Sequence, residues 1–347
     1  MAGPDPAGKG GMETAAELFL RHSGADVHYV STYRAAGRIG RLWRWAAAYA
    51  EVVVALVRRR PDVVHVHLSE RTSIFRDGGV LALARWAHVP SVLHCHGAEF
   101  EASFLALPTP LRRWARRTLR SASAVLVLGD RWIDRYSELL DLPTERFTML
   151  YNPVELPAQP PVRRAGERPV RVLFLGRLGA RKGVYDLVKA CASLPEAIRD
   201  RLELRIGGDG EVAAVRDLCG VELGSSATVL GWLGPAGKQA ELAAADVFVL
   251  PSHDEGLPMA LLEAMAWGLV PVVSTAGAMG EVVQDGRNGL LVRAGDPADI
   301  ESALRRVIAD DALRSELAGA AREDAASFAV EPYMDSVRAL WTAAAAR

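Results

Sequence analysis

The sequence predicts an α/β protein built from two doubly wound parallel sheets. Short runs rich in Val, Leu and Ile alternate along the chain with stretches of helical period, which is typical of βα units with buried parallel strands. The alternation is interrupted once, by the proline-rich segment 156–169. The length of 347 residues also favours two domains. We therefore expect domains at residues 1–160 and 161–330, followed by a C-terminal segment at 331–347.

In the first half, strand candidates are runs of β-branched residues, and helix candidates repeat apolar residues every three or four positions. Strands are expected at 26–32, 62–68, 90–96, 123–129 and 147–151, and helices at 12–22, 41–59, 77–87, 109–121 and 130–140. Residues 3–11 resemble a phosphate loop that joins a strand to a helix, yet only Met1 and Ala2 precede them. Either the true start lies upstream, or the sheet lacks what is normally a central strand, so we expect the first strand of this sheet to be missing.

The second half repeats the alternation. Strands are expected at 170–176, 202–208, 227–230, 246–250, 270–274 and 289–292, and helices at 183–193, 211–219, 237–244, 258–267, 297–308 and 312–327. Doubly wound sheets bind ligands at the carboxyl ends of their strands. We therefore expect functional residues in the loops that follow 170–176 and 246–250.

The overall composition excludes several classes of protein. With 50% hydrophobic and 24% charged residues, and 41 basic against 42 acidic side chains, the chain is neither disordered nor a nucleic-acid-binding polyelectrolyte. Three cysteines without CxxC spacing exclude a disulfide framework and a zinc ribbon. Apolar runs fall short of the roughly 18 residues needed to span a bilayer, and no signal-peptide pattern opens the chain. We expect a cytoplasmic protein.

The two halves differ in charge. Residues 1–150 hold 20 basic and 15 acidic side chains, whereas residues 151–347 hold 21 and 27. Segment 109–120 predicts a basic amphipathic helix with Leu111 and Trp114 on one face. Its arginines are Arg112, Arg113, Arg116, Arg117 and Arg120, and segment 34–45 adds Arg34, Arg38, Arg41 and Arg44 beside Trp43 and Trp45. Two interpretations stay open. The first is peripheral contact with anionic lipid at the inner face of the cell membrane, or with a lipid-diphosphate acceptor, and the second is an arginine-rich solvated surface.

The segment 251–268, PSHDEGLPMALLEAMAWG, follows a predicted buried strand. It places Glu255 in the loop before a helix and Glu263 inside that helix. The backbone at the helix start is suited to binding phosphate, because its N–H groups lack intrahelical partners. The residues of that turn are Gly256, Leu257, Pro258 and Met259. The two carboxylates can accept hydrogen bonds from sugar hydroxyls, or can be a cap and a solvated helix residue.

Two loops after predicted strands carry further candidates. In GRLGARKG, residues 176–183, Arg177 and Lys182 can converge on one anion. The guanidinium of Arg177 can donate two parallel hydrogen bonds, and the ammonium of Lys182 acts as a compact positive charge. In IGGDGE, residues 206–211, Gly208 would allow a base or ribose to approach the backbone, unless it only forms a tight turn. Neither loop has the GxGxxG pattern of dinucleotide enzymes.

Histidines occupy alternate positions of two strands in the first half. His65 and His67 lie on one predicted strand, and His94 and His96 close another. Such histidines are more often core or cleft residues than zinc ligands, although a zinc cluster is conceivable. No Asp-x-Asp pair able to hold a divalent metal against a diphosphate ends a strand. We therefore expect no metal.

Taken together, these motifs resemble glycosyltransferase family 4, the retaining GT-B enzymes of the glycosyl transferases group 1. GRLGARKG, IGGDGE, PSHDEGLPMALLEAMAWGLVPVVST and the Asn-Gly of DGRNGLLV carry the resemblance, with Gly10–Met12 and His96-Gly97 in the looser first half. It implies two Rossmann-like domains facing across a cleft, with a nucleoside-diphosphate sugar held mainly by the second. It also implies that the final helix, within 331–347, crosses back to pack on the first domain.

The resemblance also implies residue roles. By position, Arg177 and Lys182 would bind the diphosphate, Glu255 the donor sugar, Glu263 the ribose, His96 the sugar or reacting centre, and Gly10 and Gly11 the phosphates. The expected enzyme is a metal-independent, retaining hexosyltransferase without a cofactor. Its acceptor would be a glycan or a lipid-linked molecule of polysaccharide or glycolipid biosynthesis. Two alternatives are a nucleotide-sugar epimerase of the same architecture and a catalytically impaired nucleotide-sugar-binding protein.

Overall fold

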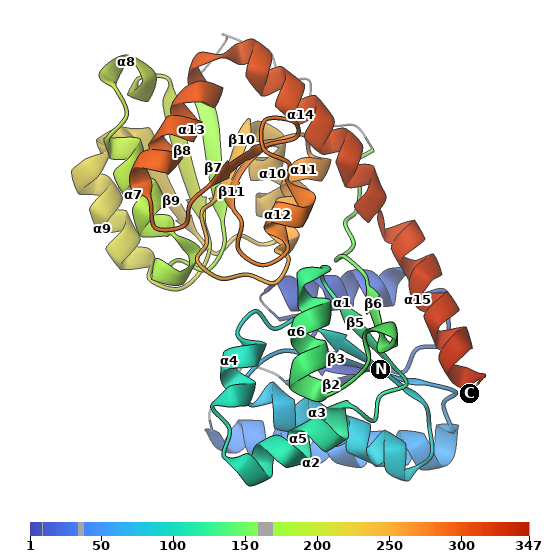
Figure 1. Cartoon of the computed structure of the whole chain (residues 1–347). Coiled ribbons are helices and arrows are strands. Elements are labelled where there is room, and N and C mark those ends of the chain that lie inside the picture. The colour runs from blue at the N-terminus through green and yellow to red at the C-terminus, as the bar shows by residue number, and fades with distance from the viewer. Residues whose placement is uncertain (9, 34–37, 159–168, 347) are drawn as a thin grey trace. The chain divides into compact units, whose positions relative to one another are not determined.

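The computed structural model describes residues 1–8, 10–33, 38–158 and 169–346, and it divides into two compact units. The first unit comprises Met1–Pro153 with Val330–Arg347, and the second Val154–Ala329. Figure 1 labels the elements of both units. The chain passes from one unit to the other after Pro153, earlier than expected. Most of the proline-rich segment, residues 159–168, lies outside the described residues.

The sheet of the first unit has six parallel strands. They are β1 (Ala2–Pro4), β2 (Val30–Tyr33), β3 (Val64–Leu68), β4 (Ser91–Cys95), β5 (Ala124–Val127) and β6 (Phe147–Met149). Their order is β2-β1-β3-β4-β5-β6, so the strand order reverses direction between β1 and β3. All neighbouring strands run parallel, which confirms the predicted doubly wound sheet.

The expectation of a missing first strand was wrong. Ala2 pairs with Val30 on β2 and with Val66 on β3, so β1 occupies an interior position of the sheet. Sequence patterns miss this strand because three residues are too few for a period, and because Gly3 and Pro4 are poor strand formers. Neighbours on both sides, rather than local propensity, make it a strand.

The helices of the first unit cover both faces of the sheet. They are α1 (Gly11–His22), α2 (Arg38–Val54), α3 (Ser73–Trp86), α4 (Phe100–Leu105), α5 (Thr109–Leu119), α6 (Arg131–Leu140) and α15 (Val330–Ala345), with the π-helical turn η1 (Ala55–Arg59) and the 3-10 turn η2 (Thr144–Arg146). Helices α2, α3 and α5 lie together on one face (Figure 1). Helix α4 was not predicted, because its six residues are too few for an amphipathic pattern.

The last helix of the chain completes the core of the first unit. On α15, Tyr333, Met334 and Val337 pack against Phe19 of α1. Further along, the Trp341 indole N–H donates a hydrogen bond of 3.0 Å to Nδ1 of His65 on β3. Residues more than 270 positions apart thus share one core, which explains why α15 belongs to the first unit.

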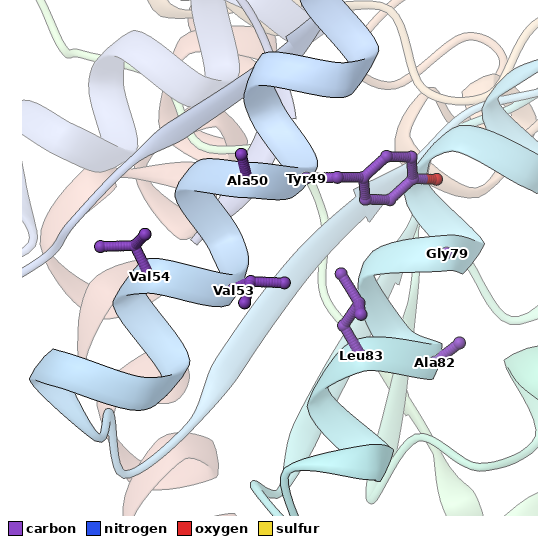
Figure 2. A pocket seen from close by; sticks show the side chains of 7 residues that line it. All are labelled: Tyr49, Ala50, Val53, Val54, Gly79, Ala82 and Leu83. Atoms are coloured by element: carbon purple, nitrogen blue, oxygen red, sulfur yellow. The ribbon is translucent and has the colours of Figure 1, made fainter.

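An apolar hollow of about 630 Å³ opens between α2 and α3 on the surface of the first unit (Figure 2). Its lining residues are Tyr49, Ala50, Val53, Val54, Gly79, Ala82 and Leu83. The Tyr49 hydroxyl donates to the carbonyl oxygen of Arg76 at 2.9 Å, which holds the two helices together at one end of the hollow.

The second unit contains another sheet of six parallel strands. They are β7 (Val170–Leu175), β8 (Leu202–Gly207), β9 (Ala227–Gly231), β10 (Val247–Leu250), β11 (Val270–Ser274) and β12 (Leu290–Val292). Their order is β12-β11-β10-β7-β8-β9, so the strand order reverses between β7 and β10. All pairs are parallel and every predicted strand of this half is present.

The helices of the second unit follow the strands as βα units require. They are α7 (Val184–Ala192), α8 (Glu196–Arg199), α9 (Val212–Glu222), α10 (Pro235–Ala244), α11 (Met259–Ala266), α12 (Met279–Val282), α13 (Pro297–Ala309) and α14 (Asp311–Ala325), with the 3-10 turns η3 (Ala180–Lys182), η4 (Gly224–Ser226) and η5 (Ala326–Phe328). Among the helices that the structure describes in either unit, none has the length and apolar character needed to cross a membrane.

Candidate active site

The strand reversal of the second unit brings the two strongest motifs together. Strand β7 pairs directly with β10, with Val172 opposite Val247. The loop 176–183 follows β7, and the loop 251–258 follows β10, so both leave the same edge of the sheet at adjacent positions. Ligands of doubly wound sheets bind at such a reversal point, because the two loops diverge there and leave a crevice.

Lys182 and Glu255 meet at this edge. The Lys182 ammonium donates a hydrogen bond to Oε1 of Glu255, and the Ser252 hydroxyl donates to the same oxygen at 3.0 Å. The side chains of Lys182 and Glu255 are 15% and 7% exposed, so the ion pair is largely shielded from water. A cation and a carboxylate are thus in direct contact at the strand reversal of this sheet.

A glycine allows the two loops to approach. Gly183 has a φ of 70°, and a β-carbon there would lie 2.2 Å from the carbonyl oxygen of Pro251. Only glycine tolerates both the left-handed backbone and this contact. Gly183 therefore determines how closely Lys182 lies to the loop that carries Glu255.

Arg177 and Gly208 lie where the loops after β7 and β8 pack together. Arg177 is exposed, and its neighbour Leu178 donates its N–H to the carbonyl oxygen of Asp209 at 2.6 Å. A β-carbon on Gly208 would lie only 1.7 Å from the carbonyl oxygen of Gly176. The structure therefore gives Gly208 a steric role in supporting the Arg177 loop, while its contact with a donor stays a prediction.

The helix after β10 begins at the edge of the same sheet. Helix α11 starts at Met259, and Pro258 is its N-cap, one position before the first turn expected for that proline. Gly256 accepts a hydrogen bond of 2.8 Å from the N–H of Ala278, which anchors the turn that also includes Leu257. In the first turn of α11 the N–H of Leu261 donates to the carbonyl oxygen of Pro258 at 3.1 Å. The N–H groups at the very start of a helix have no acceptor one turn earlier and suit an anion.

Glu263 has a partner that the sequence analysis missed. Its Oε1 accepts a hydrogen bond of 2.6 Å from Nζ of Lys238 on α10. Burial raises the pKa of Glu263, and the Lys238 ammonium opposes that rise. The one available signal was the scarcity of lysine, because only four lysines occur in the chain. Two of them pair with the two candidate carboxylates.

The remaining candidates lie in the first unit. Gly10 precedes α1 and accepts hydrogen bonds from both the N–H and the hydroxyl of Thr14, at 3.1 and 3.0 Å. Gly11 is the first residue of α1, so both glycines lie at a helix start after β1. His96 directly follows β4, and its N–H donates to the carbonyl oxygen of Leu68 at the end of β3.

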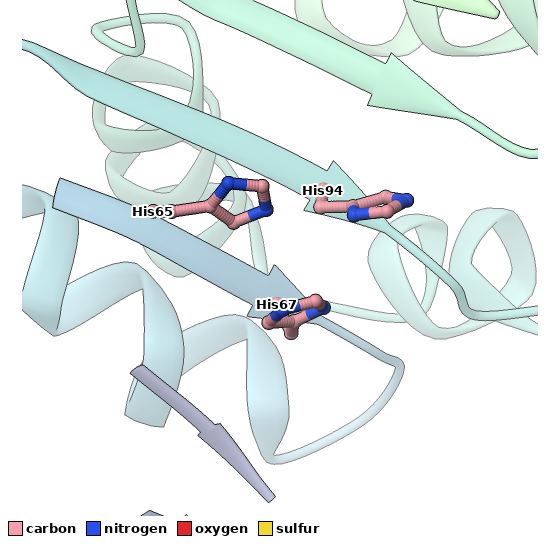
Figure 3. A group of neighbouring side chains, drawn as sticks. All are labelled: His65, His67 and His94. Atoms are coloured by element: carbon pink, nitrogen blue, oxygen red, sulfur yellow. The ribbon is translucent and has the colours of Figure 1, made fainter. Parts of the chain in front are cut away.

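His96 belongs to a cluster of four histidines. The strand period directs His65 and His67 of β3 and His94 of β4 to one face of the sheet (Figure 3), and His96, directly after β4, continues the same alternation. Nδ1 of His67 lies 2.8 Å from Nε2 of His96. Burial lowers the pKa of His65 and of His96 to about 3, so these rings are neutral near pH 7.

The same cluster is the place to consider a metal. One nitrogen each from His65, His67 and His94 lie within 4.8 Å of one another. Tetrahedral zinc requires nitrogens roughly 3.4 Å apart, each with the ion in its ring plane. The His67 ring is instead stacked against those of His65 and His94, with interplanar angles of 30°, and Trp341 already donates to Nδ1 of His65. The arrangement of these rings does not fit an ion, and the expectation of no metal stays a prediction.

Comparison with known proteins assigns the family. Residues 4–153 match the model described as glycosyl transferase 4-like domain, and residues 169–310 match glycosyl transferases group 1. The D-inositol 3-phosphate glycosyltransferase of Geodermatophilus obscurus is 32% identical over 309 residues, covering 82% of this chain and 67% of that protein. The phosphatidyl-myo-inositol mannosyltransferase of Mycobacterium leprae is 31% identical over 290 residues, covering 83% and 75%.

Solved structures agree on the fold. Sucrose-phosphate synthase from Thermosynechococcus elongatus superposes with a TM-score of 0.76 at 20% identity, over 98% of this chain and 97% of that one. Anabaena HepE, solved in complex with UDP, gives 0.73 at 19% identity, over 94% and 89%. With both halves matched in order and two parallel sheets of the expected kind, the chain belongs to glycosyltransferase family 4, the glycosyl transferases group 1, and is a glycosyltransferase of the GT-B fold.

Proposed function

We propose that this glycosyltransferase moves a hexose from a nucleoside-diphosphate sugar to a glycan or lipid-linked acceptor in polysaccharide or glycolipid biosynthesis, with retention at the anomeric carbon. The observation that carries the proposal is the contact between Lys182 and Glu255 at the strand reversal. It supplies a cation for the leaving diphosphate and a carboxylate for the sugar within one site. Arg177 lies on the same loop as Lys182 and adds a second cation.

The chemistry of sugar transfer requires charge stabilisation at the departing diphosphate. In the proposed mechanism Lys182 turns from Glu255 to the diphosphate, and Arg177 and the start of α11 contact the other phosphate oxygens. Glu255 is then free to accept hydrogen bonds from hydroxyls of the donor sugar. Two cations and a helix start neutralise the leaving group, so the proposal includes neither a metal nor a cofactor.

Retention follows from a same-face displacement, in which the acceptor attacks from the side that the diphosphate leaves. A phosphate oxygen of the leaving group takes the acceptor proton, so no side-chain nucleophile is required. His96, at the end of β4, is assigned to a hydroxyl of the sugar at the reacting centre. Gly10 and Gly11 are assigned to the phosphates.

The donor is identified by a binding screen followed by product analysis. Anabaena HepE has been solved with UDP-glucose, which makes UDP-glucose the first compound to test. A ligand that binds only the folded protein raises its unfolding midpoint, so UDP-, GDP- and ADP-glucose can be ranked by thermal shift. Incubation of the selected donor with and without acceptors then separates transfer from epimerisation. Isomerised nucleotide sugar in the acceptor-free sample would contradict the transferase proposal.

Lys238→Met is expected to weaken nucleotide binding by about tenfold at pH 6.5, if Glu263 binds ribose as an ionised acceptor. Without the ammonium, the already raised pKa of Glu263 rises further, so more of it is protonated near neutral pH. A rise to pH 8.5 favours the ionised form of Glu263, so part of the affinity is expected to return. Calorimetric titration with UDP at both pH values measures this, with the exposed Lys189→Met as control. Equal affinities for wild type and variant at pH 6.5 would remove Glu263 from the nucleotide site.

We also propose peripheral membrane contact through the first unit. On α5, only some of the arginines are available for such contact, because others are engaged within the protein. On this helix Arg112 donates to the carbonyl oxygen of Leu105 at 3.1 Å, and Arg116 to that of Leu139 at 2.8 Å. These two arginines hold the helix in place, whereas Arg113 and Arg117 are exposed. Arg34 and the side chains of Arg38 and Arg41 lie outside the described residues. On α2, Leu42 and Trp43 are 64% and 72% exposed.

The double variant Arg113→Ser/Arg117→Ser is expected to bind phosphatidylglycerol vesicles roughly 30-fold more weakly, because each basic residue near an anionic surface contributes about 1 kcal/mol. Sedimentation with these vesicles at increasing salt measures the effect. Arg305→Ser/Arg322→Ser removes the same charge from exposed positions of the second unit and is the matched control. Equal vesicle binding by the two double variants would exclude α5 as the contact.

A further inference from the structure

The four-histidine cluster contains one side-chain contact that bears on the reaction. The proposed function places His96 at the donor sugar, and His67 is the residue that touches His96, through a nitrogen pair 2.8 Å apart. Two neutral imidazoles at this distance form one N–H···N hydrogen bond, in which one ring donates its proton and the other accepts it. The tautomer of His67 therefore determines the tautomer of His96.

Burial decides which ring donates. Nε2 of His67 is buried and has no hydrogen-bond partner among the described residues. A buried N–H without an acceptor is rarer and more costly than a buried lone pair. His67 is therefore better placed with its proton on Nδ1, donating to Nε2 of His96. The proton of His96 must then sit on Nδ1, and that nitrogen is a hydrogen-bond donor toward a ligand.

The ring of His67 cannot easily turn away from this contact. It is stacked between His65 and His94, with ring centroids 5.0 and 5.2 Å away. The ring of Phe19 meets it edge-on at 5.9 Å. His67 is 2% exposed, whereas His96 is partly exposed at the end of β4. One histidine is thus buried among three rings, and it contacts another that is partly exposed directly after β4.

We propose that His67 is a positioning residue, which through its hydrogen bond keeps His96 in the Nδ1–H tautomer and orients Nδ1 as a donor to the sugar. This rests on the proposed function, because it requires that His96 act on the donor. His67 itself contacts neither donor nor acceptor in this proposal.

Substitutions at His67 separate the hydrogen bond from packing. In His67→Asn the side-chain amide occupies the place of Nδ1 and can still donate to His96, whereas His67→Leu fills the space without a donor. His67→Leu is expected to lower kcat with the selected nucleotide glucose by about 10- to 100-fold, with KM for the donor nearly unchanged. His67→Asn is expected to restore most of that loss. His65→Leu is the matched control, since His65 is equally buried on the same strand and makes no hydrogen bond to His96.

The tautomer can be observed without turnover. Nitrogen-15 spectra of histidine-labelled protein, with the His96 signal identified by its loss in His96→Ala, should show the Nδ1–H form in wild type and in His67→Asn, and a mixed population in His67→Leu. An Nε2–H form in wild type, or equal kcat values for His67→Leu and His65→Leu, would overturn the inference. If His96→Ala abolishes transfer while His67→Leu does not, the proposed function stands and the role of His67 falls. If Lys182→Met leaves transfer unchanged, the proposed function itself fails.

Discussion

Replacing Lys182 by methionine is expected to lower kcat for donor turnover by roughly 100- to 1000-fold, the loss typical when a preorganised charge at a transition state is removed. Methionine keeps most of the apolar stem, so the change isolates the ammonium. Its removal acts twice, because Lys182 is both the proposed diphosphate ligand and the partner of Glu255. Glu255, 6% exposed, would keep only the hydroxyl of Ser252.

Two further variants make this result specific. Lys189→Met removes a lysine from the exposed face of α7, a few residues along the chain, and is expected to leave kcat unchanged. Glu255→Gln tests the other half of the pair, and combining it with Lys182→Met should cost much less than the product of the single losses, because the two groups act as a unit. Turnover of Lys182→Met within threefold of wild type would refute the site assignment.

The free energy of unfolding of the first unit is expected to fall by about 5.5 kcal/mol between pH 7.5 and pH 5.5. Burial lowers the pKa of His65 and of His96 to about 3, and those of His67 and His94 well below 6.5. In the unfolded chain each of them titrates near 6.5. Between pH 6.5 and about 3 the unfolded state therefore binds protons that the folded state does not, and stability declines as the pH falls through this window. Over the interval from pH 7.5 to pH 5.5 this costs about 1.4 kcal/mol for each of the four histidines.

Urea unfolding monitored by tryptophan fluorescence at the two pH values measures this loss. His94→Leu should lower the number of protons taken up on unfolding by about one, and so weaken the pH dependence of stability. The reason is that both nitrogens of His94 are buried without partners among the described residues. His253→Gln is the control, because His253 is 45% exposed in the second unit. A stability that differs by less than 1 kcal/mol between the two pH values would show that the cluster is not buried as described.

Local patterns predicted the second unit better than the first. Strands such as Val247–Leu250 are continuous apolar runs, and each is followed by a helix of clear period, so the βα units could be read without tertiary information. Strand β1 lacked both signals, and its residues form a strand only between β2 and β3. The strand predicted at 26–32 begins at Val30 because that residue pairs with Ala2. Short helices such as α12 were missed because four residues carry no periodicity.

The sequence by itself determined the fold class, the family and the loops in which the candidate residues Arg177, Lys182 and Glu255 lie. These follow from local periodicity and from motifs within a few residues of one another. Only the tertiary structure decided which side chains meet: Lys182 with Glu255, Lys238 with Glu263, and His67 with His96. The physical reason is that partners 73, 25 and 29 residues apart are brought together by strand order and helix packing, which local sequence does not encode.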